Sequence, residues 1–279
     1  HYDPQRSILV LDLVTEAVHP LVLDDEAAPH YLAAMRRLVA SALAECHGLP
    51  VPRDIGIDAT LPDAAPWVFD FARPAPASLR ELAPAQLSVI QSVQSQPGVV
   101  AALDRLRDEW RPSRLVHGDF KWNNVLVHLD SAGVPVRVVL LDWEMAQLGD
   151  PAWDVGAVMH AFIAEAVLGL ELTDGTSPEA AAELLGDVLP RLLPAHRDFW
   201  NGYLGAAHLT DGEVEPFLHR LPLHVGARLL KSAYEWSQAE VRMPRSATAV
   251  LQLGINMLLR PAAAREVVLG LGMRDSAEA

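Results

Sequence analysis

Three polar side chains in the middle of the chain have the types and spacing that phosphoryl-transfer chemistry needs. Asp119 comes shortly after the apolar pair 115–116, Asn124 lies five positions later, and Asp142 directly follows the apolar run Val136–Leu141. A carboxylate can orient an attacking hydroxyl group and accept its proton, and carboxylate and carboxamide oxygens are hard ligands that suit Mg²⁺. The sequence therefore predicts Asp119 as a general base, with Asn124 and Asp142 as magnesium ligands.

These side chains can converge only if the strands between them pair. The apolar runs Val125–His128 and Val136–Leu141 are joined by the turn-forming residues 130–135 (DSAGVP), a pattern typical of a β-hairpin. The second strand of such a hairpin returns to the point where the first one begins. We therefore expect the base and the two ligands to lie together at the ends of three short strands.

Neighbouring residues of the same segment have supporting roles in this prediction. Lys121, one of only two lysines in the chain, stands where its charge could neutralise a moving phosphoryl group. His117 is expected to hold the loop through hydrogen bonds, because the carboxylate of Asp119 is the better placed proton acceptor. For Glu144, a second metal contact and a salt bridge both remain open.

The order of these motifs resembles the aminoglycoside phosphotransferase and choline kinase-like family. The resemblance is carried by His117-Gly118-Asp119, by the asparagine five residues after the aspartate, and by LLDWEMAQLGDPAWDVG at 140–156. It implies a protein-kinase-like fold, ATP and Mg²⁺ as cofactors, and phosphorylation of a hydroxyl group on a small molecule. It also implies that Asp154 braces the catalytic loop from the start of the next helix.

A less specific part of the resemblance covers residues 3–14. The branched apolar run Ser7–Val14 predicts a buried strand. In the family, a strand and hinge at this place receive the adenine ring. The resemblance therefore implies Asp12, Leu13 and Val14 as nucleotide contacts.

The family also has an N-terminal lobe with a phosphate-covering loop and a phosphate-binding lysine. No lysine precedes Lys121, and the only G-x-G, Gly270–Gly272, lies near the end of the chain. On these grounds we expect the N-lobe to be missing from this sequence. We expect such a chain, when isolated, to bind ATP weakly and to turn it over slowly or not at all.

Most of the remaining sequence has helical periodicity. Residues 50–84 are rich in proline and alanine, which predicts a long irregular connection. Helices are expected near 27–47, 85–96, 99–110, 154–170, 178–192, 195–208, 215–242 and 247–259.

The predicted fold class is α+β and mostly helical: a protein-kinase-like C-lobe with a short catalytic β-hairpin and a helical substrate subdomain. We expect residues 1–26 to form a hinge strand and linker and 27–156 the catalytic core. Residues 157–279 are expected to form the helical, substrate-binding subdomain.

Composition excludes several classes of partner. The 279-residue chain has a formal net charge of −14, which repels nucleic acid and anionic membrane surfaces. Its apolar runs are shorter than the roughly 18 residues that a membrane helix needs. The single cysteine, Cys46, excludes an internal disulfide and fits a reducing, cytoplasmic location.

The acceptor stays open at this point. It could be an aminoglycoside or other antibiotic, choline, a sugar or an amino alcohol. One alternative is a kinase of Ser or Thr in a precursor peptide of a peptide-modifying pathway. Another is a pseudokinase or binding module that acts with a partner chain. Several aromatic and acidic residues in the C-terminal part could either line a substrate cleft or belong to the core and to solvated loops: Trp200, Tyr203, Tyr234, Trp236, Asp211, Glu213 and Glu215.

Overall fold

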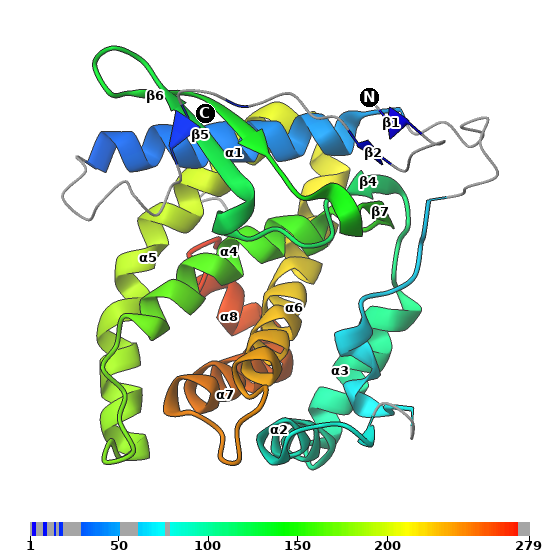
Figure 1. The fold of residues 1–279 in the computed structure, drawn as a ribbon, viewed down its shortest axis with the longest axis vertical. Helices are drawn as coiled ribbons and strands as arrows, with labels where there is room; N and C mark the ends of the chain where they lie inside the picture. The colour runs from blue at the N-terminus through cyan, green and yellow to red at the C-terminus, as the bar shows by residue number, and fades with distance from the viewer. Residues whose placement is uncertain are drawn as a thin grey trace.

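Helices form most of this computed structural model, which describes residues 2–3, 8–9, 14, 17–18, 29–50, 61–75 and 79–272 (Figure 1). The α-helices are α1 (Pro29–Gly48), α2 (Pro84–Gln94), α3 (Pro97–Asp108), α4 (Pro151–Leu168), α5 (Pro178–Ala207), α6 (Asp211–Trp236), α7 (Arg245–Leu259) and α8 (Pro261–Val267). The strands are β1 (Tyr2–Asp3), β2 (Ile8–Leu9), β3 (Ala17–Val18), β4 (Arg114–Val116), β5 (Val125–Leu129), β6 (Pro135–Leu140) and β7 (Gln147–Gly149). Three short 3-10 helices complete the described elements: η2 (Trp67–Ala72), η4 (Trp122–Asn124) and η5 (Trp143–Met145).

The predicted hairpin is confirmed as the antiparallel pair β5–β6. Its register pairs Val125 with Leu140 and Val127 with Val138. Its turn is closed by Asp130, whose carboxylate accepts hydrogen bonds from the backbone amides of Ala132 and Val134. The register therefore brings the residue after Asn124 next to the residues that precede Asp142, as the sequence pattern predicted.

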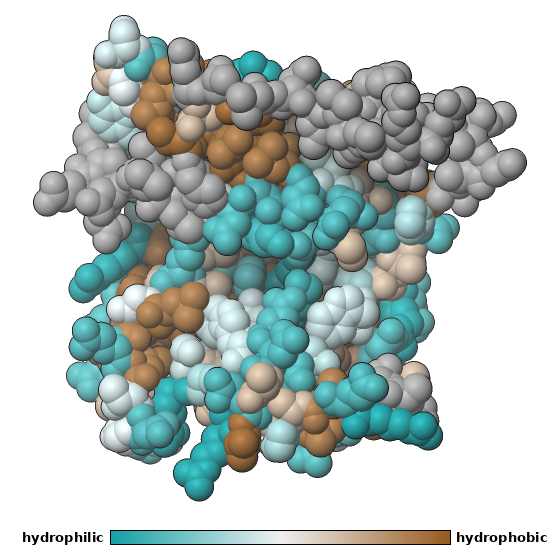
Figure 2. All heavy atoms as spheres, viewed as in Figure 1, coloured by the Kyte–Doolittle hydropathy of each residue, from teal (hydrophilic) through white to brown (hydrophobic). Residues whose placement is uncertain are grey.

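The described strands form three further antiparallel pairs, and one of them is β1 with β2. Strand β3 pairs with β5, so the order of this sheet is β3-β5-β6. Strand β4 pairs antiparallel with β7, which was not predicted from the sequence. Apolar side chains gather over the hairpin at one end of the molecule, where Val136 is 53% exposed (Figure 2).

The core runs through the helices below the hairpin. Helix α4 is apolar almost all round and is buried along most of its length, because α5, α6 and α7 all pack against it (Figure 1). Helix α1 lies along both α5 and β6. One continuous buried cluster includes residues from Met35 to Leu271, and the predicted boundary at 156–157 stays a prediction.

The helical region differs from expectation in several places. Two helices were predicted at 178–192 and 195–208, but α5 continues through Pro190 and Pro194. A proline removes one helical hydrogen bond, and burial of the following turns, which include Phe199 and Tyr203, offsets that loss.

Helix limits and short elements account for the other differences. Helix α6 begins at Asp211 rather than Glu215, because Thr210 and Glu213 form a capping box, and it ends at Trp236 rather than Arg242. Helix α8 was not predicted. The irregular connection at 50–84 contains the buried 3-10 helix η2. Of the strand predicted at Ser7–Val14, β2 is described, and residues 10–13 lie outside the described part.

No helix in the described part of the chain is long and apolar enough to cross a membrane.

The crossing of α6 and α7 depends on two glycines. A Cβ atom added to Gly254 would lie 2.8 Å from the carbonyl oxygen of Gly226, and one added to Gly226 would lie 3.1 Å from the carbonyl oxygen of Gly254. Both distances are shorter than an ordinary van der Waals contact. A side chain at 254 would therefore force the two backbones apart, and one at 226 would require its neighbours to shift by a few tenths of an ångström.

We predict that Gly254→Ala lowers the free energy of unfolding by about 1–3 kcal/mol, because a methyl group in this crossing forces the two backbones apart. Thermal unfolding followed by circular dichroism measures the effect. The control is Gly186→Ala in α5, where no heavy atom lies within 4 Å of the added Cβ. That control should leave stability unchanged or raise it by up to about 1 kcal/mol. Equal effects of the two substitutions would contradict the prediction.

Candidate active site

A buried carboxylate holds the loop that follows β4. Asp154, in the first turn of α4, is fully buried. Its Oδ2 accepts a hydrogen bond from the backbone amide of His117 at 2.6 Å, and its Oδ1 accepts one from Gly118 at 3.0 Å. The structure therefore brings Asp154 under the loop as the resemblance implied.

The turn at Gly118 can be made only by glycine. Its φ of 82° lies in the left-handed region, and an added Cβ atom would lie 2.3 Å from the carbonyl oxygen of Met145. The carbonyl oxygen of Gly118 accepts two hydrogen bonds, from Trp153 Nε1 at 3.0 Å and from Arg228 Nη2 at 2.9 Å. Both peptide groups of this glycine are therefore held by side chains from α4 and α6.

His47, which sequence reasoning missed, completes the support of the loop together with Tyr203. His47, at the end of α1, places Nε2 at 3.2 Å from Asp154 Oδ2, and its Nδ1 lies 2.8 Å from the Tyr203 hydroxyl. Burial alone would raise the pKa of Asp154. That pKa nevertheless lies below its usual value, because other contributions outweigh burial. These are the hydrogen bond and charge of His47, the charge of Arg228 and the hydrogen bond from the amide of His117. Asp154 is therefore a carboxylate at neutral pH.

Asp119 lies between the two lysines of the chain. Lys121 Nζ donates a hydrogen bond to its Oδ2 at 3.0 Å, and Lys231 Nζ lies 3.6 Å from its Oδ1. Burial raises the pKa of Asp119, but the charges of Lys231, Lys121 and Arg228 lower it further than burial raises it. Lys231 was not predicted as a site residue, although its being the second of only two lysines is a signal in the sequence.

Asn124 and Asp142 meet through the hairpin. Asn124 is buried, and its Nδ2 donates to the carbonyl oxygen of Asp119 at 3.2 Å. The amide of Leu141 donates to the carbonyl oxygen of Asn124 at 2.8 Å, which brings Asp142 beside it. Asp142 has a left-handed backbone (φ 64°) and a half-exposed side chain, with Oδ2 4.0 Å from Lys121 Nζ. The structure therefore brings together all three residues that the sequence singled out.

The donor set at Asn124 and Asp142 fits magnesium. The Asn124 carboxamide is fixed through its nitrogen, so its oxygen is the atom that remains for a cation. The described residues include no group of three or more His, Cys, Asp or Glu side chains that could hold a metal by themselves. Mg²⁺ does not need such a cage, because it is commonly held by one or two carboxylates together with substrate phosphates and water.

His117 joins the loop to the hairpin. Its Nε2 lies 2.7 Å from the carbonyl oxygen of Leu141, and its ring packs against Trp143 with a centroid distance of 4.8 Å. Its Nδ1 is buried and has no hydrogen-bond partner in the described part of the chain. The side chain thus contacts the backbone next to Asp142, an arrangement that agrees with a supporting role.

A cavity opens beside Asp119 between α4 and α6. Its volume is about 300 Å³, and its wall includes Lys231, Ser232 and Trp236 of α6 and His160 of α4. Ser232 Oγ lies 2.7 Å from His160 Nε2. The candidate base therefore faces a space of the size of a small ligand.

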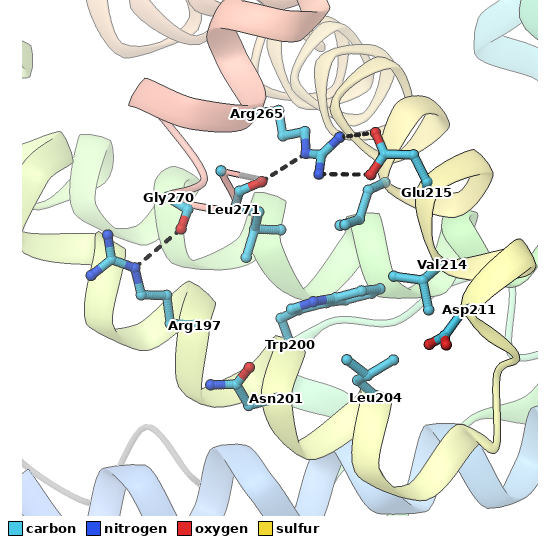
Figure 3. Close-up of a pocket in the computed structure, with 12 residues that line it drawn as sticks. Arg197, Trp200, Asn201, Leu204, Asp211, Val214, Glu215, Arg265, Gly270 and Leu271 are labelled. Atoms are coloured by element: carbon cyan, nitrogen blue, oxygen red, sulfur yellow. Dashed lines mark hydrogen bonds and ion pairs between the residues drawn. The ribbon is translucent and has the colours of Figure 1, made fainter. Parts of the chain in front are cut away.

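A larger cavity of about 470 Å³ lies between α5, α6 and α8 (Figure 3). Trp200, Asp211 and Glu215 line it, whereas no residue of the catalytic loop does. Its charged groups are largely satisfied by protein: Arg265 bonds Glu215 at 2.5 and 3.0 Å, and Arg197 Nε donates to the carbonyl oxygen of Gly270. Of these two cavities, only the smaller one includes residues of the loop after β4.

The other sequence candidates are found elsewhere or are not described. Tyr203 is buried and contributes only through His47. Tyr234 lines a third, aromatic cavity beside η2. Of the expected adenine contacts, Asp12 and Leu13 lie outside the described residues, and Val14 is half-buried.

We predict that Asp154→Asn destabilises the protein by about 3 kcal/mol, because an amide cannot accept from both loop amides and His47 as a carboxylate does. The lowered pKa of Asp154 means that its stabilisation is complete above the pKa of an unfolded aspartate and is lost as the pH falls through the folded value. Urea unfolding at several acidic pH values should therefore show a smaller loss for Asp154→Asn than for the wild type.

The matched control is Asp130→Asn, which also removes a carboxylate that accepts two backbone amides, but in an exposed turn. It should cost at most about 1 kcal/mol. A pH dependence of unfolding that is the same in the wild type and in Asp154→Asn would rule out the assigned role.

The chain is similar to known proteins in fold and in sequence. An ethanolamine kinase from Plasmodium vivax has a similar fold, with a TM-score of 0.50 and 12% sequence identity over 82% of this chain and 61% of that chain. A stretch of 64 residues is 39% identical to mouse acyl-CoA dehydrogenase family member 10, and covers 20% of this chain and 6% of that protein. The chain thus spans less than two thirds of the length of either protein. The model of the phosphotransferase enzyme family matches residues 13–184, most of the chain, and the chain therefore belongs to this family of aminoglycoside phosphotransferase and choline kinase-like proteins.

Proposed function

We propose that this protein transfers a phosphoryl group from ATP to a hydroxyl group of a small molecule in a magnesium-dependent reaction. The proposal rests on one observation: Asp119 lines a cavity of small-molecule size, and the side chain of Asn124, with Asp142 beside it, is bonded to the same loop. In this arrangement the acceptor would bind in the cavity, and the nucleotide phosphates would bind at Asn124 and Asp142. An in-line transfer needs that separation.

Asp119 would orient the acceptor hydroxyl group and accept its proton as the new phosphorus–oxygen bond forms and the bond to ADP breaks. Its lowered pKa keeps it ionised at neutral pH, which suits this task but makes it a weak base. A weak base is adequate, because in a loose transition state the hydroxyl proton need not leave before the phosphoryl group moves.

Magnesium, when bound by Asn124 and Asp142, would neutralise charge on the nucleotide phosphates. Lys121 bonds Asp119 and lies 4.0 Å from Asp142, so its ammonium group stands between the base and the metal ligands. That is the region that the transferred group must cross. Lys121 would therefore stabilise the negative charge on the phosphoryl oxygens during transfer.

The size of the cavity favours a small acceptor. Its volume of about 300 Å³ is at the lower end of the range for small-molecule sites, which supports a small-molecule acceptor over a precursor peptide. An intact set of base, lysine and ligands argues against a pseudokinase. The likeness to an ethanolamine kinase concerns the fold, so choline, sugars, amino alcohols and antibiotics stay equal candidates.

We further propose that the described residues correspond to the C-terminal lobe of a kinase-like fold, with the adenine received near Asp12, Leu13 and Val14. The loop and hairpin would contact the nucleotide phosphates from one side. Residues 157–279 would form the substrate subdomain, a division supported by the contribution of Lys231 and Ser232 of α6 to the cavity wall.

For the base, we expect Asp119→Asn to reduce phosphoryl transfer by about 10²–10⁴-fold, because an amide cannot accept the hydroxyl proton. Binding of the magnesium–nucleotide complex should change little. ADP release with a panel of hydroxyl compounds measures transfer, and a fluorescence titration measures binding. The control is Asp104→Asn, which also breaks an ion pair of a partly exposed carboxylate, here with Arg73. Undiminished transfer in Asp119→Asn would exclude it as the base.

For the metal site, we expect Asp142→Ala to remove most of the gain in nucleotide affinity that Mg²⁺ provides, at least about 10-fold. Titrations of the wild type and the variant with ATP, with and without Mg²⁺, measure this gain. Asp187→Ala, on the exposed surface of α5, serves as a control for the change in net charge. If the magnesium-dependent gain is the same in all three proteins, Asp142 is not a metal ligand.

A further inference from the structure

A buried arginine from α6 reaches the catalytic loop. Arg228 is 3% exposed, and its Nη2 donates a hydrogen bond to the carbonyl oxygen of Gly118 at 2.9 Å. Its guanidinium carbon lies 3.7 Å from the centroid of the Trp153 ring, which is a cation–π contact. Trp153 donates to the same carbonyl oxygen. Arg228 and Trp153 thus form a stacked pair on one peptide group.

A charge at this position is energetically unfavourable. Arg228 Nε is buried and has no hydrogen-bond partner, and no ion pair joins Arg228 to a carboxylate within the described ranges. Burial lowers the pKa of Arg228 to about 10, although Asp154 and Asp119 act in the opposite direction. Even a buried ion pair can often be replaced by apolar side chains of similar volume without loss of stability, and Arg228 has no ion-pair partner in the described part of the chain. Stability alone therefore does not account for an arginine here.

The peptide group that Arg228 holds is the one before the candidate base. Asp154 fixes the amide side of Gly118, and Arg228 with Trp153 fixes its carbonyl side, which is bonded directly to the nitrogen of Asp119. Rotation of this peptide would swing the Asp119 carboxylate away from the cavity. The hydrogen bond from Arg228 opposes that rotation from the side on which the acceptor would bind.

The same face of α6 forms the cavity wall. Lys231, one helical turn after Arg228, lies 3.6 Å from Asp119 Oδ1, and Ser232 next to it lines the cavity and bonds His160. We infer that Arg228 is a positioning residue that joins this wall to the catalytic loop, so that acceptor and base are held in one rigid frame. The expected loss of kcat rests on the proposed phosphotransferase function. The expected loosening of the loop does not.

The experiment compares Arg228→Met with the wild type in the full chain. We expect kcat to fall about 10- to 100-fold with KM for ATP within about 2-fold, because a displacement of the base near 1 Å costs up to about 100-fold. The melting temperature should stay the same or rise. Hydrogen exchange of peptides that cover residues 115–124 should become faster. Arg245→Met is the matched control, because Arg245 also donates to a backbone carbonyl, that of Asp174, but at an exposed place.

A second variant, Arg228→Lys, keeps a charge and a donor without the planar stacking group, and should recover part of kcat and part of the exchange protection. If Arg228→Met does not fold, Arg228→Lys alone tests the inference by the same two measurements. Unchanged kcat and unchanged exchange in both variants would overturn the inference. A fall in melting temperature that accompanies the loss of kcat, with no specific change at 115–124, would also overturn it, since that is the result of a purely structural role.

The two proposals fail in different ways. If the wild type transfers no phosphoryl group to any acceptor, while Arg228→Met still increases exchange at 115–124, the proposed function is wrong and the positioning role is supported. If the wild type is active and Arg228→Met matches Arg245→Met in kcat and exchange, the function stands and the inference is wrong.

Discussion

The structure depends on a single buried carboxylate that accepts hydrogen bonds from consecutive amides. The chain must turn sharply after β4 to present Asp119, and such a turn leaves the amides of His117 and Gly118 without partners in any strand or helix. Asp154 supplies both acceptors and stays ionised because His47 donates to it, and His47 is in turn held by Tyr203. A carboxylate with fewer partners would be costly to bury. The network takes one side chain from each of α1, α4 and α5, so it fixes the place where these three helices meet.

The charge distribution of the site follows from the same arrangement. A chain with a net charge of −14 keeps both of its lysines at one aspartate, and Arg228 is close enough to act on the same carboxylate. These cations lower the pKa of Asp119 against the effect of burial, so that as the proposed base it would orient a hydroxyl group rather than remove its proton early. In the proposed reaction the same positive charges would meet the nucleotide phosphates and the transferred group. One local excess of positive charge in an acidic protein would then act on both the base and the anionic substrate.

The sequence predicted what is encoded locally. The hairpin could be predicted because alternating apolar runs and a turn of known chemistry lie within 16 residues, and the register then brought Asn124 and Asp142 together. Asp154 was expected to brace the loop, but the roles of the more distant supports could not be predicted. His47, Tyr203 and Arg228 are 71 or more positions from Gly118 and belong to no motif. The continuous helix α5 was also beyond local reasoning, because its two prolines argue for a break, whereas burial of the later turns against neighbouring helices decides the outcome.

The motif His117-Gly118-Asp119 therefore does not by itself determine the geometry of the candidate site. His117, Gly118 and Asp119 specify a turn and a carboxylate, but nothing in these three residues fixes the direction in which the carboxylate points. Side chains outside the motif hold both peptide groups of Gly118: Asp154 of α4 accepts from its amide, and Trp153 of α4 and Arg228 of α6 donate to its carbonyl oxygen. Helix α6 packs on both α4 and α7, where Gly226 and Gly254 allow close contact, so its position is determined by the core and not by the loop. If Arg228 positions the proposed base, a change in α6 that adapts the cavity to another acceptor must leave Arg228 in place, because otherwise Asp119 would move as well.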